Sequence, residues 1–492
     1  MTKPRTRGEL PAQGYGPERY AGRSVKQEMR ENVLAKLDRG EELFPGIVGY
    51  EDTVIPQILN SLLSKHNFIL LGLRGQAKSR ILRALVNFLD DEIPVIAGCE
   101  INDSPYAPIC RACRLLVAEK ADDTPVAFLH RERRYVEKLA TPDVTIADII
   151  GDIDPIKAAR GGLALSDELT IHYGLLPRAN HGIFAINELP DLAAKIQVGL
   201  FNIMQEGDIQ IKGYPVRLPL DLCLVFTANP EDYTARGKIV SPLKDRIGSE
   251  IRTHYPTTRD EGLQITRQEA WLNRDGAGTV TLPAFVAEIV EEIAFQARQS
   301  KKVDKRSGVS QRMPITCMEN LLSNAERRAR PAREKTIVPR VADVYAAMTS
   351  LTGKFELEYE GEMRGAEQVG QELIRAAIGR VFQHYFGEAN LQQVVQWFEL
   401  GGALKVPENA RARELLNQFR KIQGLVESTA PLGLQSKSDP SLLVAGCEFI
   451  LEGLHAHRRI SRNEERGFYA EAPSRPAPSP RPASPRYRRS YQ

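Results

Sequence analysis

One stretch of this sequence leaves few possible folds. The apolar run at 67–71 has the length of a strand, a glycine-containing loop follows it, and residues 79–89 have the spacing of a helix. A strand, a loop and a helix in that order form one βα unit of a parallel sheet. Further strands, too apolar to be half exposed, are expected at 93–97, 182–186 and 222–227. We therefore expect a three-layer α/β core around a parallel sheet.

Other patterns place elements around this core. Residues 25–37 have helical spacing, and the alternation at 208–219 predicts a hairpin. Beyond about residue 258 the strand patterns end and helical spacing dominates, as at 285–297. The last twenty-one residues hold five arginines, six prolines and no acid, which predicts a disordered basic tail.

The lengths of the apolar runs and the use of cysteine limit the class of protein. The longest apolar runs, such as 68–71 and 183–186, are far shorter than the roughly eighteen residues of a membrane span. The first thirty residues are basic and have no apolar signal segment, so we expect a cytoplasmic protein. Six cysteines in 492 residues cannot form a disulfide framework, and they are expected to be free thiols or metal ligands.

The loop after the first strand has the pattern of a phosphate-binding P-loop. It reads Gly-Leu-Arg-Gly-Gln-Ala-Lys-Ser from Gly72 to Ser79, between a strand and a helix as the pattern requires. In such a loop Lys78 reaches the β- and γ-phosphates and the Ser79 hydroxyl binds Mg²⁺. Ala77 departs from the pattern, which has glycine there, so we expect weakened binding; a purely structural turn is the alternative. The residues expected to bind nucleotide are Gly72, Arg74, Gly75, Gln76, Ala77, Lys78 and Ser79.

The apolar run at 182–186 ends in two polar residues, Asn187 and Glu188. A Walker B motif has an aspartate and then a glutamate in these places, the first for the Mg²⁺ shell and the second to orient the attacking water. Glu188 is therefore the candidate general base. Asn187 can bind Mg²⁺ through water but lacks the charge of a carboxylate, so slow hydrolysis is expected. A helix cap after a strand is the structural alternative for this pair.

The order of the motifs resembles the AAA+ ATPase series. After the P-loop and Glu188 come Asn229 behind a strand, Arg246 in a Leu-Lys-Asp-Arg turn, and Arg312 in Gly-Val-Ser-Gln-Arg before a helix. By this resemblance Asn229 is sensor 1, Arg246 is the arginine finger that reaches a neighbouring subunit, and Arg312 is sensor 2 from a helical lid. An isolated arginine is otherwise usually a solvated surface group. The expected catalytic residues are Glu188, Asn229, Arg246 and Arg312.

Within AAA+, the stretch at 144–192 is similar to magnesium-chelatase I subunits and MoxR ATPases. It contains Ile-Ile-Gly-Asp-Ile-Asp at 149–154 and Gly-Leu-Leu-Pro-Arg-Ala-Asn-His-Gly at 174–182, in the helix-2 insert and Walker B region of that branch. The similarity covers roughly residues 46–330. It implies a homo-oligomeric ring, a hexamer in this branch, that works beside a partner with a von Willebrand A domain.

The patterns and the resemblance together predict five segments. They are a basic segment with a helix at 1–45, an α/β ATPase core at 46–257 with an insertion at about 99–140, a helical lid at 258–355, a further mostly helical region at 356–471 and the tail at 472–492. The arginines of the tail could touch nucleic acid, but a flexible solubilising end is favoured, so nucleic-acid binding is not expected beyond weak contact.

A group of cysteines lies inside the expected insertion. Cys99, Cys110, Cys113 and His130 have the spacing Cys-x10-Cys-x2-Cys-x16-His. Three thiolates and an imidazole could close a tetrahedral Zn²⁺ site. The spacing from Cys99 to Cys110 is loose and His130 lies among arginines that would oppose a cation, so ordinary free thiols are the favoured alternative.

Three functions fit these residues. The first is a motor that hydrolyses ATP with Mg²⁺ to remodel or activate a protein partner. The second is the ATPase subunit of a metal chelatase that inserts Mg²⁺ into a tetrapyrrole. The third is a nucleotide-gated scaffold that scarcely hydrolyses ATP, because of Asn187 and Ala77. ATP and Mg²⁺ are the expected cofactors, and Zn²⁺ is a weaker expectation.

Overall fold

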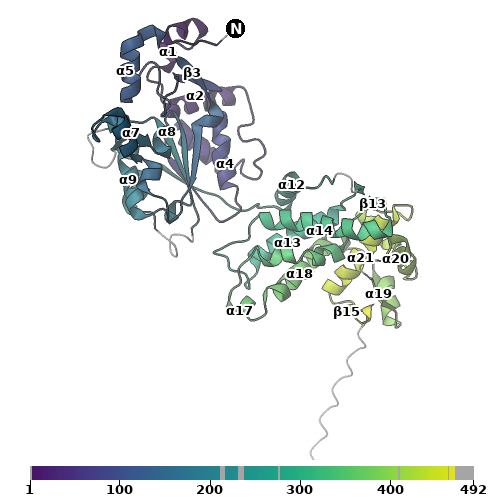
Figure 1. Cartoon of the computed structure of the whole chain (residues 1–492). Coiled ribbons are helices and arrows are strands. Elements are labelled where there is room, and N and C mark those ends of the chain that lie inside the picture. The colour runs from purple at the N-terminus through teal and green to yellow at the C-terminus, as the bar shows by residue number, and fades with distance from the viewer. Residues whose placement is uncertain are drawn as a thin grey trace, which may run out of the picture. The chain divides into compact units, whose positions relative to one another are not determined.

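The computed structural model describes residues 3–210, 217–230, 238–274, 278–407, 410–463 and 465–470 (Figure 1). They form two compact units. The first contains the described residues up to Ile265 together with Val303–Arg312 and Lys354–Glu356, and the second contains the others. No helix in the described part of the chain is long and apolar enough to cross a membrane. The expected tail at 472–492 lies outside the described residues.

A five-stranded parallel sheet lies at the centre of the first unit. Its strands are β1 (Phe68–Leu71), β4 (Tyr135–Leu139), β7 (Gly182–Asn187), β10 (Leu222–Ala228) and β11 (Ser249–Arg252). They stand in the order β11-β1-β10-β7-β4, and each neighbouring pair is parallel. Leu71 pairs with Ala228 on one side and with Arg252 on the other, so these strands end at one edge of the sheet. The parallel sheet expected from the sequence is confirmed.

Helices cover both faces of this sheet. Phe68 and Leu70 of β1 belong to one hydrophobic core, and Ile69 and Leu71 belong to the other. Successive side chains of a strand point to opposite faces, so an apolar run of this length needs cover on both. The first core includes α2 (Val25–Asp38), α3 (Val54–Leu63) and α4 (Lys78–Ala84), and the second includes α6 (Ile146–Ile149), α8 (Leu175–Arg178), α9 (Ala194–Gln205) and α11 (Ser241–Arg246). The three-layer α/β core is confirmed.

The segment between α4 and β7 differs from the expected arrangement. The strand expected at 93–97 forms as β2 (Glu92–Ile96), but it pairs antiparallel with β3 (Val126–His130), outside the five-stranded sheet. Pro94 lies in the middle of β2 and has no N–H to donate, which restricts such a strand to an edge. The sheet instead takes its edge strand β4 from residues expected in the insertion at about 99–140. The inserted part therefore ends before Tyr135.

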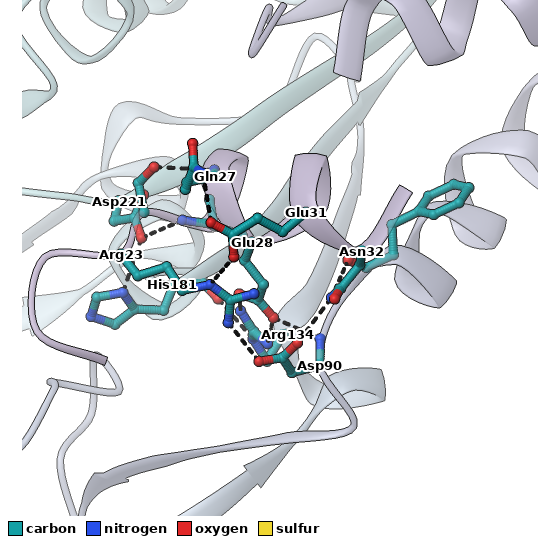
Figure 2. Close-up of polar contacts among 12 residues, drawn as sticks. Arg23, Gln27, Glu28, Glu31, Asn32, Asp90, Arg134, His181 and Asp221 are labelled. Carbon is teal, nitrogen blue, oxygen red and sulfur yellow. Dashed lines mark hydrogen bonds and ion pairs between the residues drawn. The ribbon is translucent and has the colours of Figure 1, made fainter. Parts of the chain in front are cut away.

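A buried ion pair fastens α2 to the sheet, as Figure 2 shows. Arg134, which is 1% exposed, donates from its two terminal nitrogens to the Glu28 carboxylate at 2.7 and 2.6 Å. Its Nε donates to the carbonyl oxygen of His181 at 2.8 Å. His181 Nδ1 in turn lies 3.1 Å from Asp221 Oδ2, which also accepts the N–H of Val25 at 2.8 Å. The N-terminal helix is thus part of the α/β unit.

Asp90 also belongs to this polar network (Figure 2). The Asp90 N–H donates to Glu28 Oε1 at 2.6 Å, and the Asp90 carboxylate accepts from Arg23 at 2.6 Å and from Asn32 at 2.9 Å. Burial alone would raise the pKa of Asp90, but the hydrogen bonds from Arg23 and Asn32 outweigh it and lower the pKa. This carboxylate is therefore charged at neutral pH.

The second unit is mainly helical, as expected for the residues beyond about 258. Its long helices are α13 (Ala284–Gln299), α14 (Arg312–Ala332, all but its first residue), α18 (Ala366–Phe386) and α21 (Pro440–Ala456). α18 packs on α13 and on α21. The rings of Phe285 and Phe449 stack with their centroids 4.7 Å apart. Described residues from the expected lid at 258–355 and from the expected region at 356–471 lie together in this unit.

Shorter elements complete the described chain. The hairpin expected at 208–219 is represented by the antiparallel strands β8 (Asp208–Gln210) and β9 (Arg217–Pro219), and its turn lies outside the described residues. The remaining strands are β5 (Gly151–Ile153), β6 (Ile171–Tyr173), β12 (Thr279–Val280), β13 (Thr336–Ile337), β14 (Ala403–Leu404), β15 (Ser461–Asn463) and β16 (Gly467–Tyr469). The remaining α-helices are α1 (Pro17–Tyr20), α5 (Arg111–Lys120), α7 (Pro155–Gly161), α12 (Arg259–Glu269), α15 (Val341–Ala346), α16 (Thr349–Thr352), α17 (Tyr359–Glu362), α19 (Gln392–Glu399) and α20 (Ala412–Phe419). The 3-10 helices are η1 (Arg7–Glu9), η2 (Pro11–Gln13), η3 (Leu85–Phe88), η4 (Ala121–Asp123), η5 (Arg131–Arg134), η6 (Glu168–Thr170), η7 (Leu189–Asp191) and η8 (Glu427–Leu432).

Candidate functional site

Lys78 lies at the carboxyl edge of the sheet, where it begins α4 and is 7% exposed. Its Nζ donates to Asn229 Oδ1 at 2.7 Å, to the carbonyl oxygen of Leu73 at 3.0 Å and to the carbonyl oxygen of Gly72. Ser79, the next residue, is exposed in the first turn of the helix. The ammonium group is therefore bound jointly by the P-loop and by the residue that follows β10.

Asn229 connects the lysine to Glu188. Its Nδ2 donates to Glu188 Oε2 at 3.0 Å, so hydrogen bonds join Lys78, Asn229 and Glu188 in one chain. Glu188 has a backbone φ of 55°, in the left-handed region, and its N–H donates to Thr227 Oγ1 at 3.1 Å. A backbone in this region costs about 1–3 kcal/mol for a residue other than glycine, and such residues gather at functional sites. Three residues predicted to act together thus lie in direct contact.

Two glycines of the P-loop let other segments approach it closely. A Cβ on Gly72 would lie 1.8 Å from Thr253 Oγ1, and a Cβ on Gly75, whose φ is 74°, would lie 2.0 Å from Ser310 Oγ. Thr253 follows β11, and its hydroxyl donates to Gln76 Oε1 at 2.7 Å. A side chain at either glycine would displace these neighbours from the loop.

Ala77 adopts a conformation that glycine takes more easily. Its φ of 56° and ψ of 12° are left-handed, and it is the N-cap residue of α4. For an alanine this conformation costs roughly 1–2 kcal/mol relative to the right-handed one. The methyl group is exposed. The departure from the P-loop pattern therefore takes the form of backbone strain.

Asn187 lies beside a carboxylate that sequence reasoning missed. The amide is 8% exposed, its Oδ1 accepts from the Thr227 hydroxyl at 3.2 Å, and its Nδ2 donates to Glu137 Oε1. Glu137 lies on β4, where Leu139 pairs with Asn187, and it also accepts from Arg83 Nε at 2.9 Å. No motif in the sequence marks Glu137, because β4 falls in the expected insertion. The pairing of β4 with β7 is what brings it to the site.

Arg246 lies against α9, away from the chain of Lys78, Asn229 and Glu188. Its Nε and NH2 donate to Gln205 Oε1 at 3.2 and 2.8 Å, and the guanidinium lies 5.1 Å from the centre of the Phe201 ring. These contacts keep the arginine on the surface formed by α9 and α11. Within one polypeptide, Arg246 is therefore not part of the hydrogen-bonded group of Lys78, Asn229 and Glu188.

The segment before Arg312 reaches the P-loop. Arg74 donates to the carbonyl oxygen of Gly308 at 3.5 Å, and the Tyr255 hydroxyl donates to the carbonyl oxygen of Arg74 at 2.9 Å. Arg312 is exposed, and its N–H donates to Ser310 Oγ at 3.1 Å. The segment that carries the predicted sensor 2 thus packs on the loop that carries the predicted phosphate site.

A second cluster of functional groups lies in the inserted part. The ligand atoms of Cys99, Asp103, Cys110 and Cys113 all lie within 4.8 Å of one another. His130, the predicted fourth zinc ligand, is not in this group: it is exposed at the end of β3, and its Nδ1 accepts the N–H of Glu132 at 3.4 Å. Asp103 takes its place beside the three thiols, an arrangement closer to the metal-site alternative than to the separate free thiols that the sequence favours. Nothing in the local sequence marks Asp103 as a ligand.

The charges of this cluster are coupled. Hydrogen bonds from the Cys110 and Cys113 thiols lower the pKa of the Cys99 thiol well below its usual range. Burial and the charge of Cys99 raise the pKa of Asp103. Each of these groups therefore changes the proton affinity of the others.

Comparison with known proteins finds relatives over part of the chain. No family model matches the chain. The chain is 25% identical over 241 residues to a magnesium-chelatase 38 kDa subunit of Acidiphilium rubrum, covering 48% of this chain and 65% of that protein. It is 30% identical over 210 residues to a magnesium-chelatase subunit ChlI homolog of Methanocaldococcus jannaschii, covering 42% of this chain and 53% of that protein. The chain thus spans between half and two thirds of the length of these curated relatives.

Among solved structures, the chain is similar to a complex between subunits BchI and BchD of magnesium chelatase. One chain of that complex is 22% identical, with 65% of this chain and 98% of that chain covered. The TM-score is 0.35, which is too low to add support.

Proposed function

We propose that this chain, a AAA+ ATPase related to the magnesium-chelatase I subunits, hydrolyses ATP to remodel or activate a protein partner. The observation that carries the proposal is the hydrogen-bonded chain of Lys78, Asn229 and Glu188 at the carboxyl edge of the parallel sheet. Ligands of open parallel sheets bind at this edge. A lysine, an amide and a carboxylate are also the groups that phosphoryl transfer to water needs there.

The residues present fit a nucleotide with Mg²⁺. The Lys78 ammonium is held by an amide and by backbone carbonyl oxygens, all of which it can leave for phosphate oxygens. Ser79 and, through water, Asn187 would hold the metal ion. A bound Mg²⁺ neutralises charge on the β- and γ-phosphates. Glu188 orients the attacking water and takes its proton, while Asn229 positions both the water and Glu188.

Glu137 supplies charge that Asn187 lacks. The carboxylate of Glu137 accepts a hydrogen bond from the Asn187 amide, so a negative group stands next to the place where a Walker B aspartate would be. Glu137 is shared with Arg83, which reduces its effect. We therefore propose slow but real turnover, with Glu137 as a positioning residue for the metal shell.

The proposed active form is a ring of identical subunits, with six members as in the related branch. Arg246 is held on the surface formed by α9 and α11, and we propose that it completes the site of a neighbouring subunit. Arg312, next to the P-loop segment, acts on the nucleotide of its own subunit. A protein with a von Willebrand A domain is the proposed partner, and the cytoplasm, where ATP and free thiols coexist, is the proposed compartment.

A second candidate is the ATPase subunit of a magnesium chelatase, which the names of the relatives favour. The test is to replace the I subunit of a reconstituted magnesium chelatase by this chain and to measure insertion of Mg²⁺ into the porphyrin. Insertion above the level without an I subunit supports this candidate, and a background rate beside normal ATP hydrolysis excludes it.

The primary test is steady-state ATP hydrolysis with Mg²⁺ at a series of protein concentrations. The wild type is expected to turn over, with a specific activity that rises with concentration because Arg246 acts between subunits. Lys78→Ala and Glu188→Gln should lose nearly all turnover, about 100-fold or more for groups that act on the transition state. Lys437→Ala and Glu360→Gln, exposed residues of the second unit, are the matched controls and should retain it.

Other results would change the proposal. Nucleotide binding without turnover in the wild type, with turnover in Asn187→Asp, would make the chain a nucleotide-gated scaffold. Absence of ATP binding would remove the P-loop assignment.

A further inference from the structure

We propose that Cys99, Asp103, Cys110 and Cys113 form a structural Zn²⁺ site in the inserted part of the α/β unit. In a tetrahedral zinc site with Zn–S bonds of about 2.3 Å, the ligand atoms lie roughly 3.5–3.8 Å apart. The four ligand atoms here already lie within 4.8 Å of one another. Closing such a site therefore needs shifts of about 1 Å or less in each side chain.

Asp103 provides a separate observation that points to a cation. The residue is fully buried, at 0% exposed, and its Oδ2 accepts the N–H groups of Cys110 at 2.9 Å and Ile109 at 3.2 Å. Its Oδ1 is also buried and makes no hydrogen bond among the described residues. A buried carboxylate oxygen without a hydrogen-bond partner destabilises the folded state by about 1–3 kcal/mol. A metal ion bound by Oδ1 and the three sulfurs would remove that cost.

The backbone around the sulfurs is arranged as it is at metal–thiolate centres. The N–H of Asp103 donates to Cys99 Sγ at 3.3 Å, and the N–H of Cys113 donates to Cys110 Sγ at 3.4 Å. N–H donors of this kind stabilise negative sulfur and orient it toward a metal. Cys110 also caps α5, so the helix fixes the position of two of the four ligands.

The charge of a zinc centre and the cavity beside the cluster bear on the proposal. Three thiolates and a carboxylate around Zn²⁺ carry a net charge of about −2, which needs compensation in a buried place. A cavity of about 210 Å³ adjoins the cluster, and Lys157 lines it together with the three cysteines. Lys157 Nζ donates to Glu100 Oε1 and to the carbonyl oxygen of Ile171, each at 3.1 Å. Glu100 and Glu168 line the same cavity, so Lys157 offsets Glu100 first, and what the cavity offers the site is an opening beside the three sulfurs.

Zinc suits this donor set better than other common metals. Buried thiolates in a tetrahedral arrangement favour Zn²⁺ or iron–sulfur clusters over Mg²⁺, which prefers oxygen ligands in an octahedron. The three sulfurs of the site come with one oxygen, whereas the common iron–sulfur clusters are held by four cysteines. The site would tie the loop after β2 to the start of α5, independently of the nucleotide site.

The test measures metal on the full-length chain, purified without added metal or chelator. We expect about one zinc per chain by mass spectrometry of the metal content. After exchange for Co²⁺, the absorption spectrum should have the d–d bands of a tetrahedral ion and thiolate-to-cobalt charge transfer. Removing zinc with a chelator should lower the melting temperature, since structural zinc stabilises the fold that binds it.

Matched variants identify the ligands. Cys99→Ala, Cys113→Ala and Asp103→Asn should each bind metal at least about tenfold more weakly. Cys317→Ala, which changes a buried cysteine of the second unit, should keep the full zinc content, as should His130→Ala and Lys78→Ala. Because Lys78 lies in the proposed nucleotide site and not in the cluster, the zinc content of Lys78→Ala separates this site from the proposed ATPase activity.

Three outcomes would overturn the proposal. The first is a wild type that contains no zinc and gives no tetrahedral thiolate spectrum with Co²⁺. The second is a wild type that contains iron in place of zinc. The third is loss of the metal in His130→Ala while Asp103→Asn keeps it. The Co²⁺ spectrum of the wild type decides the question even if the cysteine variants fail to fold.

Discussion

At the scale of single residues, the nucleotide site combines a predicted arrangement with an unpredicted neighbour. Lys78, Asn229 and Glu188 could be found from the sequence, because each follows a strand whose carboxyl end lies at the same edge of a parallel sheet. Glu137 could not be found, because its role depends on which strand pairs with β7. Asp103 could not be found for the same reason. The spacing of cysteines and histidines in a sequence does not show that the loop after β2 folds back onto the start of α5.

The contact between Asn187 and Glu137 makes a prediction about charge. Glu137→Gln should lower kcat by about tenfold, equivalent to ~1.4 kcal/mol, because it removes the carboxylate nearest to the metal shell. Asn187→Asp in the same chain should restore much of the loss. ATP hydrolysis as a function of Mg²⁺ concentration measures both changes.

Glu132→Gln, which changes an exposed residue just before β4, is the control and should behave as the wild type. Additive effects of the two substitutions, with no rescue in the double variant, would show that Glu137 and Asn187 act separately.

At the scale of elements, the sequence predicts which segments form strands better than it predicts which strands pair with each other. The runs at 68–71, 182–187 and 222–228 are strands of the sheet, as apolar runs of that length should be. β2 is also largely buried, yet Pro94 and its partner β3 keep it out of the sheet. β4, which carries the charged residues Glu137 and Lys138, has the composition of an edge strand and takes the edge position.

The buried ion pair that fastens α2 makes a prediction about stability. Glu28→Gln leaves the Arg134 guanidinium buried without its carboxylate, so it should reduce the free energy of unfolding of the first unit by about 3–5 kcal/mol. Glu31→Gln on the same helix breaks a more exposed pair with Arg23 and should cost no more than about 1 kcal/mol.

Urea unfolding followed by two probes measures this effect. Both tryptophans, Trp271 and Trp397, lie in the second unit, so their fluorescence follows that unit, while hydrogen exchange of the amides of α2 follows the first. A loss of protection below about 1 kcal/mol in Glu28→Gln would mean that the ion pair contributes no more than an exposed one.

At the scale of the whole molecule, the distribution of the predicted catalytic groups matters most. Lys78, Asn229 and Glu188 form one connected group, whereas Arg246 is held on another surface of the same unit by Gln205 and Phe201. In the proposed ring, a second copy supplies the arginine that completes the site of its neighbour. This is the arrangement expected from the AAA+ resemblance, and it can be tested by mixing subunits.

Mixing two inactive variants should restore activity. Lys78→Ala retains a usable Arg246, and Arg246→Ala retains a usable nucleotide site, so an equal mixture should recover about a quarter of the wild-type interfaces if subunits associate at random. ATP hydrolysis of the mixture, compared with each variant alone, measures the recovery. The double variant mixed with either single variant is the control and should stay inactive, whereas normal activity of Arg246→Ala alone would place Arg246 outside the catalytic site.

The double cover of the sheet has a practical consequence for spectroscopy. Leu70 and Leu71 are neighbours in the chain, yet Leu70 belongs to the core of α2, α3 and α4, and Leu71 to the core that contains Cys110 and Cys113. Selective isotope labelling of leucine methyl groups would therefore place two reporters back to back on one strand. If zinc binding shifts only the Leu71 resonances, its effect is confined to the face of the sheet that contains the cysteines. If a substitution in α2 shifts only the Leu70 resonances, its effect is confined to the opposite face.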